Sequence, residues 1–525
     1  MNALTVLFAG RLASQAGEPV FSGQSALALA LEQARQFPGA AKIVVLGREG
    51  EDFSGPGSPA EAVLRPQWTK KAFLESLSAL SRGFDLTYVA WADCPFLDPA
   101  LAGAMAERHI RYGAEYSYAD GWPYGFSPEI LSPGTAGILL KILGDDEGPV
   151  ERDCLFSVLQ KDINAFDIET EISPVDLRRH RLTLAADSKR NLLLLTRFAE
   201  AAGGVPAAKD AEGIMAGKPE ILRTLPNFYP LQVSGVCPQA CSLCPYPRFS
   251  PSGPAAERRD FMEPARFERL LENIAAFSGD AVIDLSLWGE LALHPQKMEL
   301  IRLVLARPEL ALVVETSGVG WKTEDFEAAQ SLAVTASAAA ADRISPLPPL
   351  SWIVSLDAAD PRRYREVRGP GFAEAAAAAK SLLALFPADT YVQAVRTEGA
   401  EDDIEQFYRS WKETAPRGAA NIIIQKYDDF CGLLPKKQAS DLSPVQRQPC
   451  WHIMRDLPVL MDGRVPLCRE DLPALRGEDR RVLGNVFTET LETIWNRGRP
   501  YYEEQSQKNY QDICAGCDEY YTYNF

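Results

Sequence analysis

The chain has 525 residues, 46% of them hydrophobic and 24% charged, a composition that excludes disorder as its default state. Its length predicts two or three domains. The formal net charge of −17 argues against nucleic acid or an anionic membrane as a partner, because both bind basic surfaces. The first residues do not resemble a signal peptide and no apolar run is long enough to span a bilayer, so we expect a cytoplasmic protein.

The N-terminal part alternates short apolar runs with helical patterns. Residues 5–9, 42–46 and 86–90 read as strands, and Asp98-Pro99 is a favourable start for a helix over residues 100–112. This alternation predicts an α/β domain over residues 1–198. The stretch 199–226 is rich in Ala, Gly and Pro and is predicted to be a linker or an interdomain helix with loops.

A second alternation follows over residues 227–430. The predicted strands are 231–236, 281–288, 311–316, 352–356, 390–395 and 421–425. Helical stretches separate them, so we predict an α/β partial barrel of six βα repeats with its active site at the carboxyl ends of the strands. Residues 431–525 are irregular and rich in cysteine, and form a predicted small tail domain.

Ten cysteines without an export signal indicate metal binding where they cluster and packing where they are isolated. The clustered ones are Cys237, Cys241 and Cys244, then Cys450, Cys468, Cys514 and Cys517. Cys94, Cys154 and Cys431 stand alone, and we predict that they are buried packing residues.

The first cluster lies directly after the first predicted barrel strand. A four-iron cubane usually takes four thiolates, so Cys237, Cys241 and Cys244 can hold one and leave the fourth iron open for catalysis. The alternatives are a zinc knuckle and an accidental grouping. Zinc usually requires a fourth ligand, and neither a His nor a fourth Cys lies nearby in the sequence.

The spacing Cys-x3-Cys-x2-Cys resembles the signature of the radical S-adenosylmethionine superfamily. Four further motifs resemble that family in its order: Trp288-Gly289-Glu290, Glu315-Thr316-Ser317-Gly318, Ser355-Leu356-Asp357 and Tyr364 with Arg368-Gly369. Trp288 departs from the family's pattern, which has glycine there. The resemblance implies that the cofactor is bound by Gly289, Glu290, Ser317, Ser355, Asp357 and Arg368.

In that family the cluster, a [4Fe-4S] centre, reductively cleaves S-adenosylmethionine and the resulting 5′-deoxyadenosyl radical abstracts hydrogen from a substrate. The resemblance implies an electron donor such as flavodoxin or ferredoxin and assigns no catalytic residue of the chain itself. The protein's own task is binding and orientation, because the cofactor supplies the difficult chemistry.

In the tail, Cys450, Gly463 and Cys468 follow the spacing that opens the SPASM extension of this superfamily, and Cys514 with Cys517 supplies a close pair. The full SPASM pattern has seven cysteines and two auxiliary clusters. The four here imply one auxiliary [4Fe-4S] cluster. The alternative is a structural zinc ion held by the same four thiolates.

Residues 1–198 resemble the nucleotidyltransferases that make nucleotide-sugars, and the glycosyltransferase-A fold. The resemblance rests on residues 8–11, on 92–99, and on Tyr124-Gly125, Glu129 and Asp187. It implies that Asp93 binds a divalent metal. Glu18 stands where that family has a lysine, and a carboxylate repels phosphate, so we expect no transferase activity.

The order of the three parts resembles the spiro-SPASM family. The resemblance does not identify the substrate. We expect hydrogen abstraction from a nucleotide-linked, for example nucleotide-sugar-linked, or polymeric substrate, which the N-terminal domain recognises or formerly processed. One alternative is a peptide-modifying enzyme whose N-terminal domain docks the peptide. The other is a non-enzymatic iron–sulfur scaffold, against which Glu290 and Ser355 argue, because they have no role without the cofactor.

Overall fold

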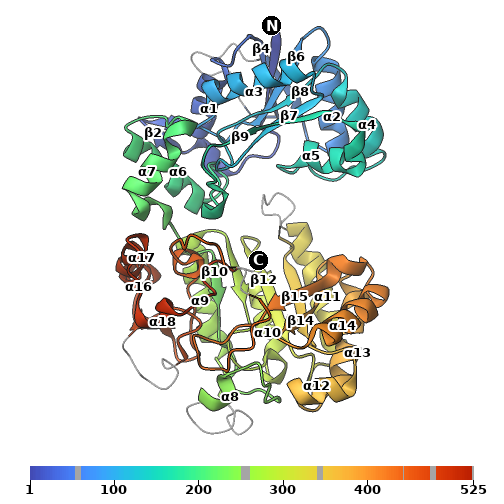
Figure 1. Cartoon of the computed structure of the whole chain (residues 1–525), viewed down its shortest axis with the longest axis vertical. Helices are drawn as coiled ribbons and strands as arrows, with labels where there is room; N and C mark the ends of the chain where they lie inside the picture. The colour runs from blue at the N-terminus through green and yellow to red at the C-terminus, as the bar shows by residue number, and fades with distance from the viewer. Residues whose placement is uncertain are drawn as a thin grey trace. The chain divides into compact units, whose positions relative to one another are not determined.

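A computed structural model describes residues 1–51, 53, 61–249, 260–339, 347–440, 443–472 and 481–522. The chain forms two compact units, Met1–Thr224 and Leu225–Phe525 (Figure 1). Among the helices so described, none has both the length and the apolar character needed to cross a membrane.

Unit 1 is built on a mainly parallel seven-stranded sheet in the order β5-β4-β1-β6-β8-β7-β9, in which β8 is antiparallel to both of its neighbours. The strands are β1 (Ala3–Phe8), β4 (Ala40–Arg48), β5 (Glu61–Arg65), β6 (Leu86–Trp91), β7 (Tyr116–Asp120), β8 (Glu129–Leu131) and β9 (Ile168–Ile172). A small separate pair is formed by β2 (Pro19–Phe21) and β3 (Gln24–Ser25). The predicted α/β class of this part is confirmed.

The α-helices of unit 1 are α1 (Ala26–Ala34), α2 (Lys70–Leu80), α3 (Pro99–Tyr112), α4 (Thr135–Leu143), α5 (Cys154–Leu159), α6 (Lys189–Ala202) and α7 (Ala211–Gly217). Helix α3 begins where the sequence predicts, because the Asp98 carboxylate accepts hydrogen bonds from the amides of Ala100 and Leu101. It ends at Gly113, whose left-handed conformation closes the last turn.

The predicted linker 199–226 is not a separate segment in the structure. Most of it belongs to unit 1, which extends to Thr224. The amide of Ala208 donates to the second oxygen of Asp98 at 2.7 Å, and the Arg197 guanidinium donates to the carbonyl of Arg223 at 2.9 Å. These bonds fasten the segment to the domain, and the segment contains α7, as the predicted alternative of a helix with loops implied.

Unit 2 contains a six-stranded parallel sheet in the sequential order β10 to β15. Its strands are β10 (Phe228–Pro230), β11 (Ala281–Asp284), β12 (Leu310–Thr316), β13 (Leu350–Ser355), β14 (Thr390–Arg396) and β15 (Ile422–Lys426). The intervening long helices are α9 (Pro264–Ser278), α10 (Lys297–Leu305), α11 (Thr323–Ala339), α13 (Phe372–Leu385) and α14 (Glu401–Thr414), and α12 (Pro361–Val367) is shorter. The predicted partial barrel is confirmed.

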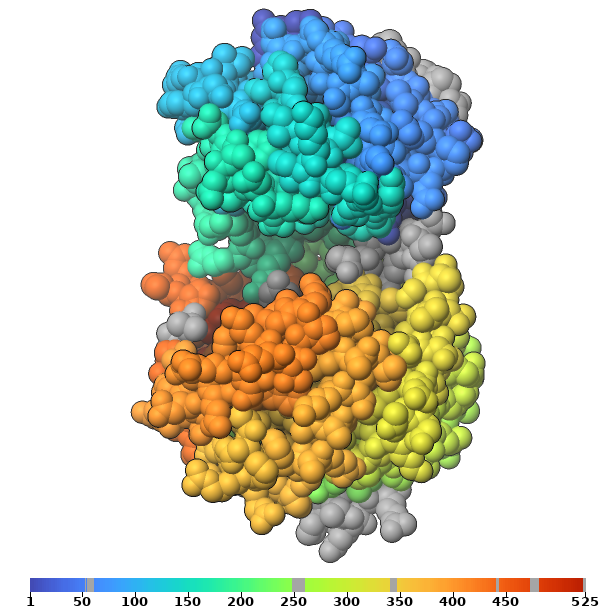
Figure 2. Space-filling view, turned by 90° about the vertical axis from the view of Figure 1, so that its right-hand side faces the viewer, coloured from blue at the N-terminus to red at the C-terminus, as the bar shows by residue number. Residues whose placement is uncertain are grey.

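Burial explains why this sheet is stable. Every residue of β13 is buried, and Trp352 at its centre contacts the rings of Trp321, Phe326 and Phe386. A parallel sheet requires such a cover of apolar side chains, which the helices provide. Figure 2 shows part of that cover as a continuous yellow-to-orange surface of unit 2.

The first barrel strand differs from the prediction. Residues 231–236 lie beyond β10 and make single bridges, Leu231 to Val459 and Ser234 to Phe261. Residues 231–236 therefore lead from the sheet into the cysteine loop, the segment that carries Cys237, Cys241 and Cys244. The regular pairing of β10 with β11 ends at Pro230, at the edge of the sheet where the candidate site lies.

The cysteine-rich tail is part of unit 2, so the predicted domain 431–525 does not form a compact unit of its own. Its amides of Leu457 and Val459 donate to the carbonyls of Phe228 and Pro230, which extends the barrel sheet by irregular pairing. The tail's elements are α15 (Trp451–Arg455), β16 (Arg464–Pro466), β17 (Val482–Asn485), α16 (Leu491–Arg497), α17 (Arg499–Ser506) and α18 (Asp512–Ala515).

Candidate functional site

The principal cavity of unit 2 has a volume of about 250 Å³ and opens at the carboxyl ends of the parallel strands. The residues predicted from the sequence line it together: Cys237, Cys241, Cys244, Gly289, Glu290, Ser317, Ser355, Asp357 and Arg368. They come from five separate stretches of chain. The fold therefore brings the residues of the predicted motifs together around one cavity.

A buried glutamine within the cysteine loop fixes its conformation. The Gln239 amide donates to the Tyr364 hydroxyl at 2.7 Å, and its carbonyl oxygen accepts from the Arg368 guanidinium at 3.2 Å and lies 3.7 Å from the Cys241 sulfur. Arg368 in turn forms an ion pair of 2.6 Å with Asp357. Asp357 and Arg368 thus hold the loop that carries the thiols, besides lining the cavity.

The turn at Gly289 brings two strand ends into contact. A Cβ atom there would lie 2.0 Å from the carbonyl oxygen of Ser234, and the residue has φ of +92°, so only glycine fits. The next amide, that of Glu290, donates to the carbonyl of Val236, the residue before the first ligand cysteine. Trp288 also has a positive φ, of +47°, and its ring stacks on Tyr246.

The Glu290 carboxylate is buried and accepts four hydrogen bonds. The donors are the Thr316 hydroxyl, the Ala292 amide, and both the amide and the hydroxyl of Ser317, at 2.7 to 3.1 Å. Such an array holds the carboxylate in one position. Glu290 and Ser317, predicted from separate motifs, therefore form one unit of the cavity wall.

A second polar group lies at the ends of β12, β13 and β14. Glu315 accepts from the Ser355 hydroxyl and the Gln393 amide, both at 2.8 Å. Two buried acceptors lining the same cavity, Oδ1 of Asp284 and Oε1 of Gln393, have no hydrogen-bond partner among the residues that the structure describes. Buried acceptors normally find donors, so these two atoms indicate a ligand with donor groups.

The tail cysteines gather around a second cavity. Cys450, Cys468, Cys514 and Cys517 line it, and so does Cys431. The prediction that Cys431 is an isolated packing residue is wrong. The loop after β15 turns sharply, and this places Cys431 among thiols that are far from it in the sequence.

Sequence comparisons agree with this grouping. The model of the SPASM family, described as an iron–sulfur cluster-binding domain, matches residues 450–518. An uncharacterized protein of Treponema pallidum (strain Nichols) is 36% identical over 383 residues, which cover 71% of this chain and 98% of the relative. The chain belongs to one family with that relative. It carries a SPASM match, an iron–sulfur cluster-binding domain, over residues 450–518.

Two solved structures are similar at low identity. One, titled as BtrN in complex with AdoMet and 2-DOIA, is 16% identical, covers 56% of this chain and 94% of its own, and has a TM-score of 0.35. The other, a cytidylyltransferase from Leptospira borgpetersenii, is 16% identical, covers 42% and 95%, and has a TM-score of 0.36. Likeness at this level assigns no substrate to this chain.

Cys237, Cys241 and Cys244 line the first cavity, and five cysteines line the second. Thiolates are the usual ligands of iron–sulfur clusters, so the chemistry of both donor sets fits such a cluster.

Burial raises the pKa of the Cys237 and Cys244 thiols to about 12. Ligand thiols must lose their protons to bind metal, so cluster insertion releases protons at these positions. Without the cluster, both thiols stay protonated at neutral pH.

The sequence reasoning missed four residues at this site: Gln239, Asp284, Gln393 and Glu470. Gln239 was visible inside the cysteine motif, and Asp284 lies within the predicted strand 281–288 and is the last residue of β11. Burial raises the pKa of both Asp284 and Glu470 to about 7. Glu470 lines both cavities and thus lies between the two groups of cysteines.

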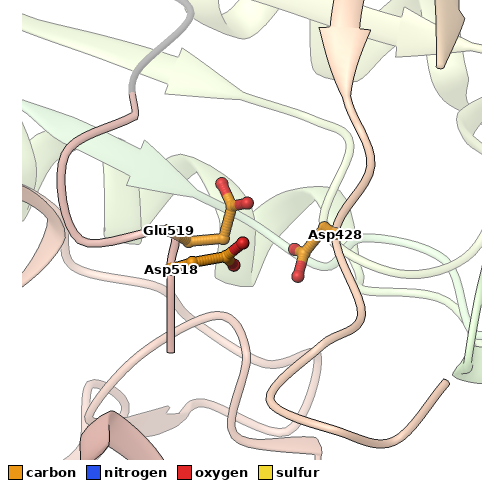
Figure 3. Close-up of side chains that lie close together, drawn as sticks. All are labelled: Asp428, Asp518 and Glu519. Carbon is orange, nitrogen blue, oxygen red and sulfur yellow. The ribbon is translucent and has the colours of Figure 1, made fainter. Parts of the chain in front are cut away.

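Three carboxylates come close together beside the second cavity. Asp428, on the loop after β15, faces Asp518 and Glu519 near the end of the chain (Figure 3). The Lys426 ammonium contacts both Asp518, at 3.1 Å, and Glu519. This lysine already balances much of the negative charge, so the group is a salt-bridge network.

In unit 1, the side chain of Arg152 lies between the two predicted acidic residues. Its guanidinium forms ion pairs of 2.7 Å with Asp93 and 2.9 Å with Asp187. It also stacks over the rings of Trp91 and Tyr124. The two carboxylates are paired with an internal cation, and this arrangement does not fit a divalent metal at Asp93.

Proposed function

We propose that the protein is an enzyme that uses S-adenosylmethionine to abstract hydrogen from a polar substrate. When bound, a [4Fe-4S] cluster supplies one electron that cleaves the sulfonium carbon–sulfur bond, giving methionine and a 5′-deoxyadenosyl radical. The observation that supports this proposal is the convergence of Cys237, Cys241 and Cys244 with the buried Glu290 array on one cavity.

The chain's own residues bind and orient. The three thiols hold the cluster, and the Gln239–Arg368–Asp357 network keeps their loop in place. The Gly289 turn and the Glu290 carboxylate form the wall nearest the loop and are proposed to position the amino acid part of S-adenosylmethionine. Reduced flavodoxin or ferredoxin is the proposed electron source.

The substrate is proposed to be rich in hydrogen-bond donors, as the hydroxyl groups of a sugar are. The unpartnered oxygens of Asp284 and Gln393 require donors, and the same cavity presents Asp428, Arg469 and Glu470. These features favour a nucleotide-sugar-linked substrate over an apolar peptide side chain. The N-terminal unit is then proposed to recognise the substrate without transferring a nucleotide.

The test is S-adenosylmethionine cleavage. Anaerobically reconstituted, dithionite-reduced protein should form 5′-deoxyadenosine, and Cys241→Ala should abolish its formation. Cys154→Ala, which changes a buried cysteine of unit 1, should leave it intact. Unchanged product formation in Cys241→Ala would contradict the proposal, and no formation in the wild type would favour a scaffold.

A second measurement concerns the tail. The wild-type chain should hold about eight irons, and a variant with Cys514 and Cys517 both changed to alanine about four. Wild-type protein that holds only four irons, with zinc or nothing in the tail, would remove the auxiliary cluster from the proposal.

A further inference from the structure

The second cavity is lined by a histidine as well as by the five cysteines. His452 is only 5% exposed, and its ring contributes to the cavity wall. Its Nε2 atom is buried and has no hydrogen-bond partner among the residues that the structure describes. Buried polar atoms normally have a partner, so this nitrogen indicates a group that binds inside the cavity.

The other ring nitrogen of His452 is already bonded. Nδ1 donates to the carboxylate of Asp456 at 2.6 Å, and Asp456 lies four residues later, at the end of α15. The second oxygen of Asp456 pairs with the Arg455 guanidinium, also at 2.6 Å. The Asp456 amide donates to the His452 carbonyl at 2.7 Å. Side-chain and backbone bonds together therefore fix the orientation of the imidazole ring.

The short helix that carries this ring is attached to its surroundings on both sides. The Arg455 guanidinium lies over the ring of Phe228 in β10, 4.5 Å from the ring centre. Cys450 immediately precedes α15, and its amide donates to the Gln505 side chain at 2.9 Å. The helix thus begins next to one predicted thiol ligand and presents His452 to the same cavity two residues later.

A second histidine of unit 2 shows the pattern of a purely structural role. His294 uses both nitrogens: Nε2 donates to the Met262 carbonyl, and Nδ1 accepts from the Gln296 amide, each at 3.0 Å. His452 uses only one. Histidines that bind metal usually donate their other ring N–H to a carboxylate or a carbonyl, which holds the ring in position and strengthens it as a ligand. His452 and Asp456 have this arrangement.

We propose that Nε2 of His452 is a ligand of the auxiliary cluster. A four-iron cluster has four ligand positions, so three of the five thiols that line the cavity complete the set. An imidazole is neutral, whereas a thiolate carries a negative charge. A cluster with one histidine ligand therefore accepts an electron more readily, at a higher reduction potential, than a cluster with four thiolates. This inference rests on the proposed auxiliary cluster.

The experiment uses the full-length chain with Cys237, Cys241 and Cys244 all changed to alanine, so that only the auxiliary cluster can form. This parent is produced with ¹⁵N-labelled histidine, reconstituted and reduced, and then studied by pulsed electron paramagnetic resonance. We expect the strong hyperfine coupling of one directly bound histidine nitrogen. The coupling should disappear in His452→Cys, which should keep about four irons, and should persist in His294→Gln.

A redox titration gives an independent measurement. The midpoint potential of His452→Cys should be more negative than that of the parent, because the new thiolate adds negative charge. Cys154→Ala, which changes a buried cysteine of unit 1, should cause no shift in the same parent.

Three outcomes would overturn the inference, and they can be told apart. A parent with about four irons but without the coupling would have a cluster bound by thiolates alone. A coupling that survives in His452→Cys would come from another histidine. If the parent holds no iron at all, the auxiliary cluster of the proposed function fails, and this inference fails with it.

Discussion

Replacing Arg152 tests whether an internal guanidinium has taken the place of a metal in unit 1. The Arg152 side chain is 20% exposed, and its partners Asp93 and Asp187 are 0% and 15% exposed. Arg152→Met keeps most of the volume and removes the charge. It leaves the buried Asp93 carboxylate and the partly buried Asp187 carboxylate without this guanidinium.

Removing one partner of a buried ion pair costs about 3–5 kcal/mol, because the remaining charge stays buried. Arg178 is a matched control in the same unit, since it also bridges two aspartates, Asp120 and Asp176, but its side chain is 58% exposed. Exposed pairs contribute about 0–1 kcal/mol. The free energy of unfolding should therefore fall several times more in Arg152→Met than in Arg178→Met.

The assay is chemical unfolding of the full chain, with hydrogen exchange of unit 1 peptides to locate the loss. Saturating Mg²⁺ or Mn²⁺, at one hundred times its dissociation constant, should restore about 2.7 kcal/mol to Arg152→Met and nothing to the wild type. Equal losses in the Arg152 and Arg178 variants would refute the argument from burial. Stabilisation of the wild type by the metal would show that Arg152 does not fill the site.

Two further predictions concern unit 2. Gly289→Ala should destabilise unit 2 more than Gly369→Ala does. Gly369 has a similar positive φ but open space for a Cβ atom, so its replacement should cost about 1–3 kcal/mol from backbone strain alone. Equal losses of stability in thermal unfolding would contradict the predicted clash with Ser234. Burial raises the pKa of Asp284 to about 7, so the folded chain binds this proton more tightly than the unfolded chain does. As the pH rises from about 4 to 7, the free energy of unfolding of the wild type should therefore fall by about 1.4 kcal/mol per pH unit. Urea unfolding of cluster-free Asp284→Asn protein should not show this pH-dependent loss of stability. If the free energy of unfolding changes with pH in the same way in both proteins, the prediction is contradicted.

The sequence predicted the elements that depend on local patterns. The barrel strands from β11 to β15 lie within a few residues of their predicted positions, because buried parallel strands are short apolar runs bounded by polar residues. The prediction was wrong at β10, where the same kind of apolar run, 231–236, is hydrogen-bonded irregularly to the tail and to Phe261. Composition does not distinguish a strand from a buried loop.

What the sequence could not predict are contacts between distant residues. Cys431 lines the second cavity together with Cys517, and Arg152 lies between Asp93 and Asp187. No spacing rule relates these positions. Both contacts change the chemistry expected at the site, because one adds a thiol to a cluster pocket and the other supplies a cation where a metal was predicted.

The motif residues Asp357 and Arg368 illustrate how a correctly placed residue can work through another. Both line the principal cavity, as predicted, yet their strongest contacts are with each other and, through Arg368, with Gln239 in the cysteine loop. The Asp357 carboxylate also accepts from the Val395 amide at 2.7 Å, which ties the ion pair to β14. Replacing either residue should therefore change the conformation of the cysteine loop, in addition to any direct contact with the cofactor. For this reason, the effects of such changes should be measured on iron content as well as on S-adenosylmethionine binding.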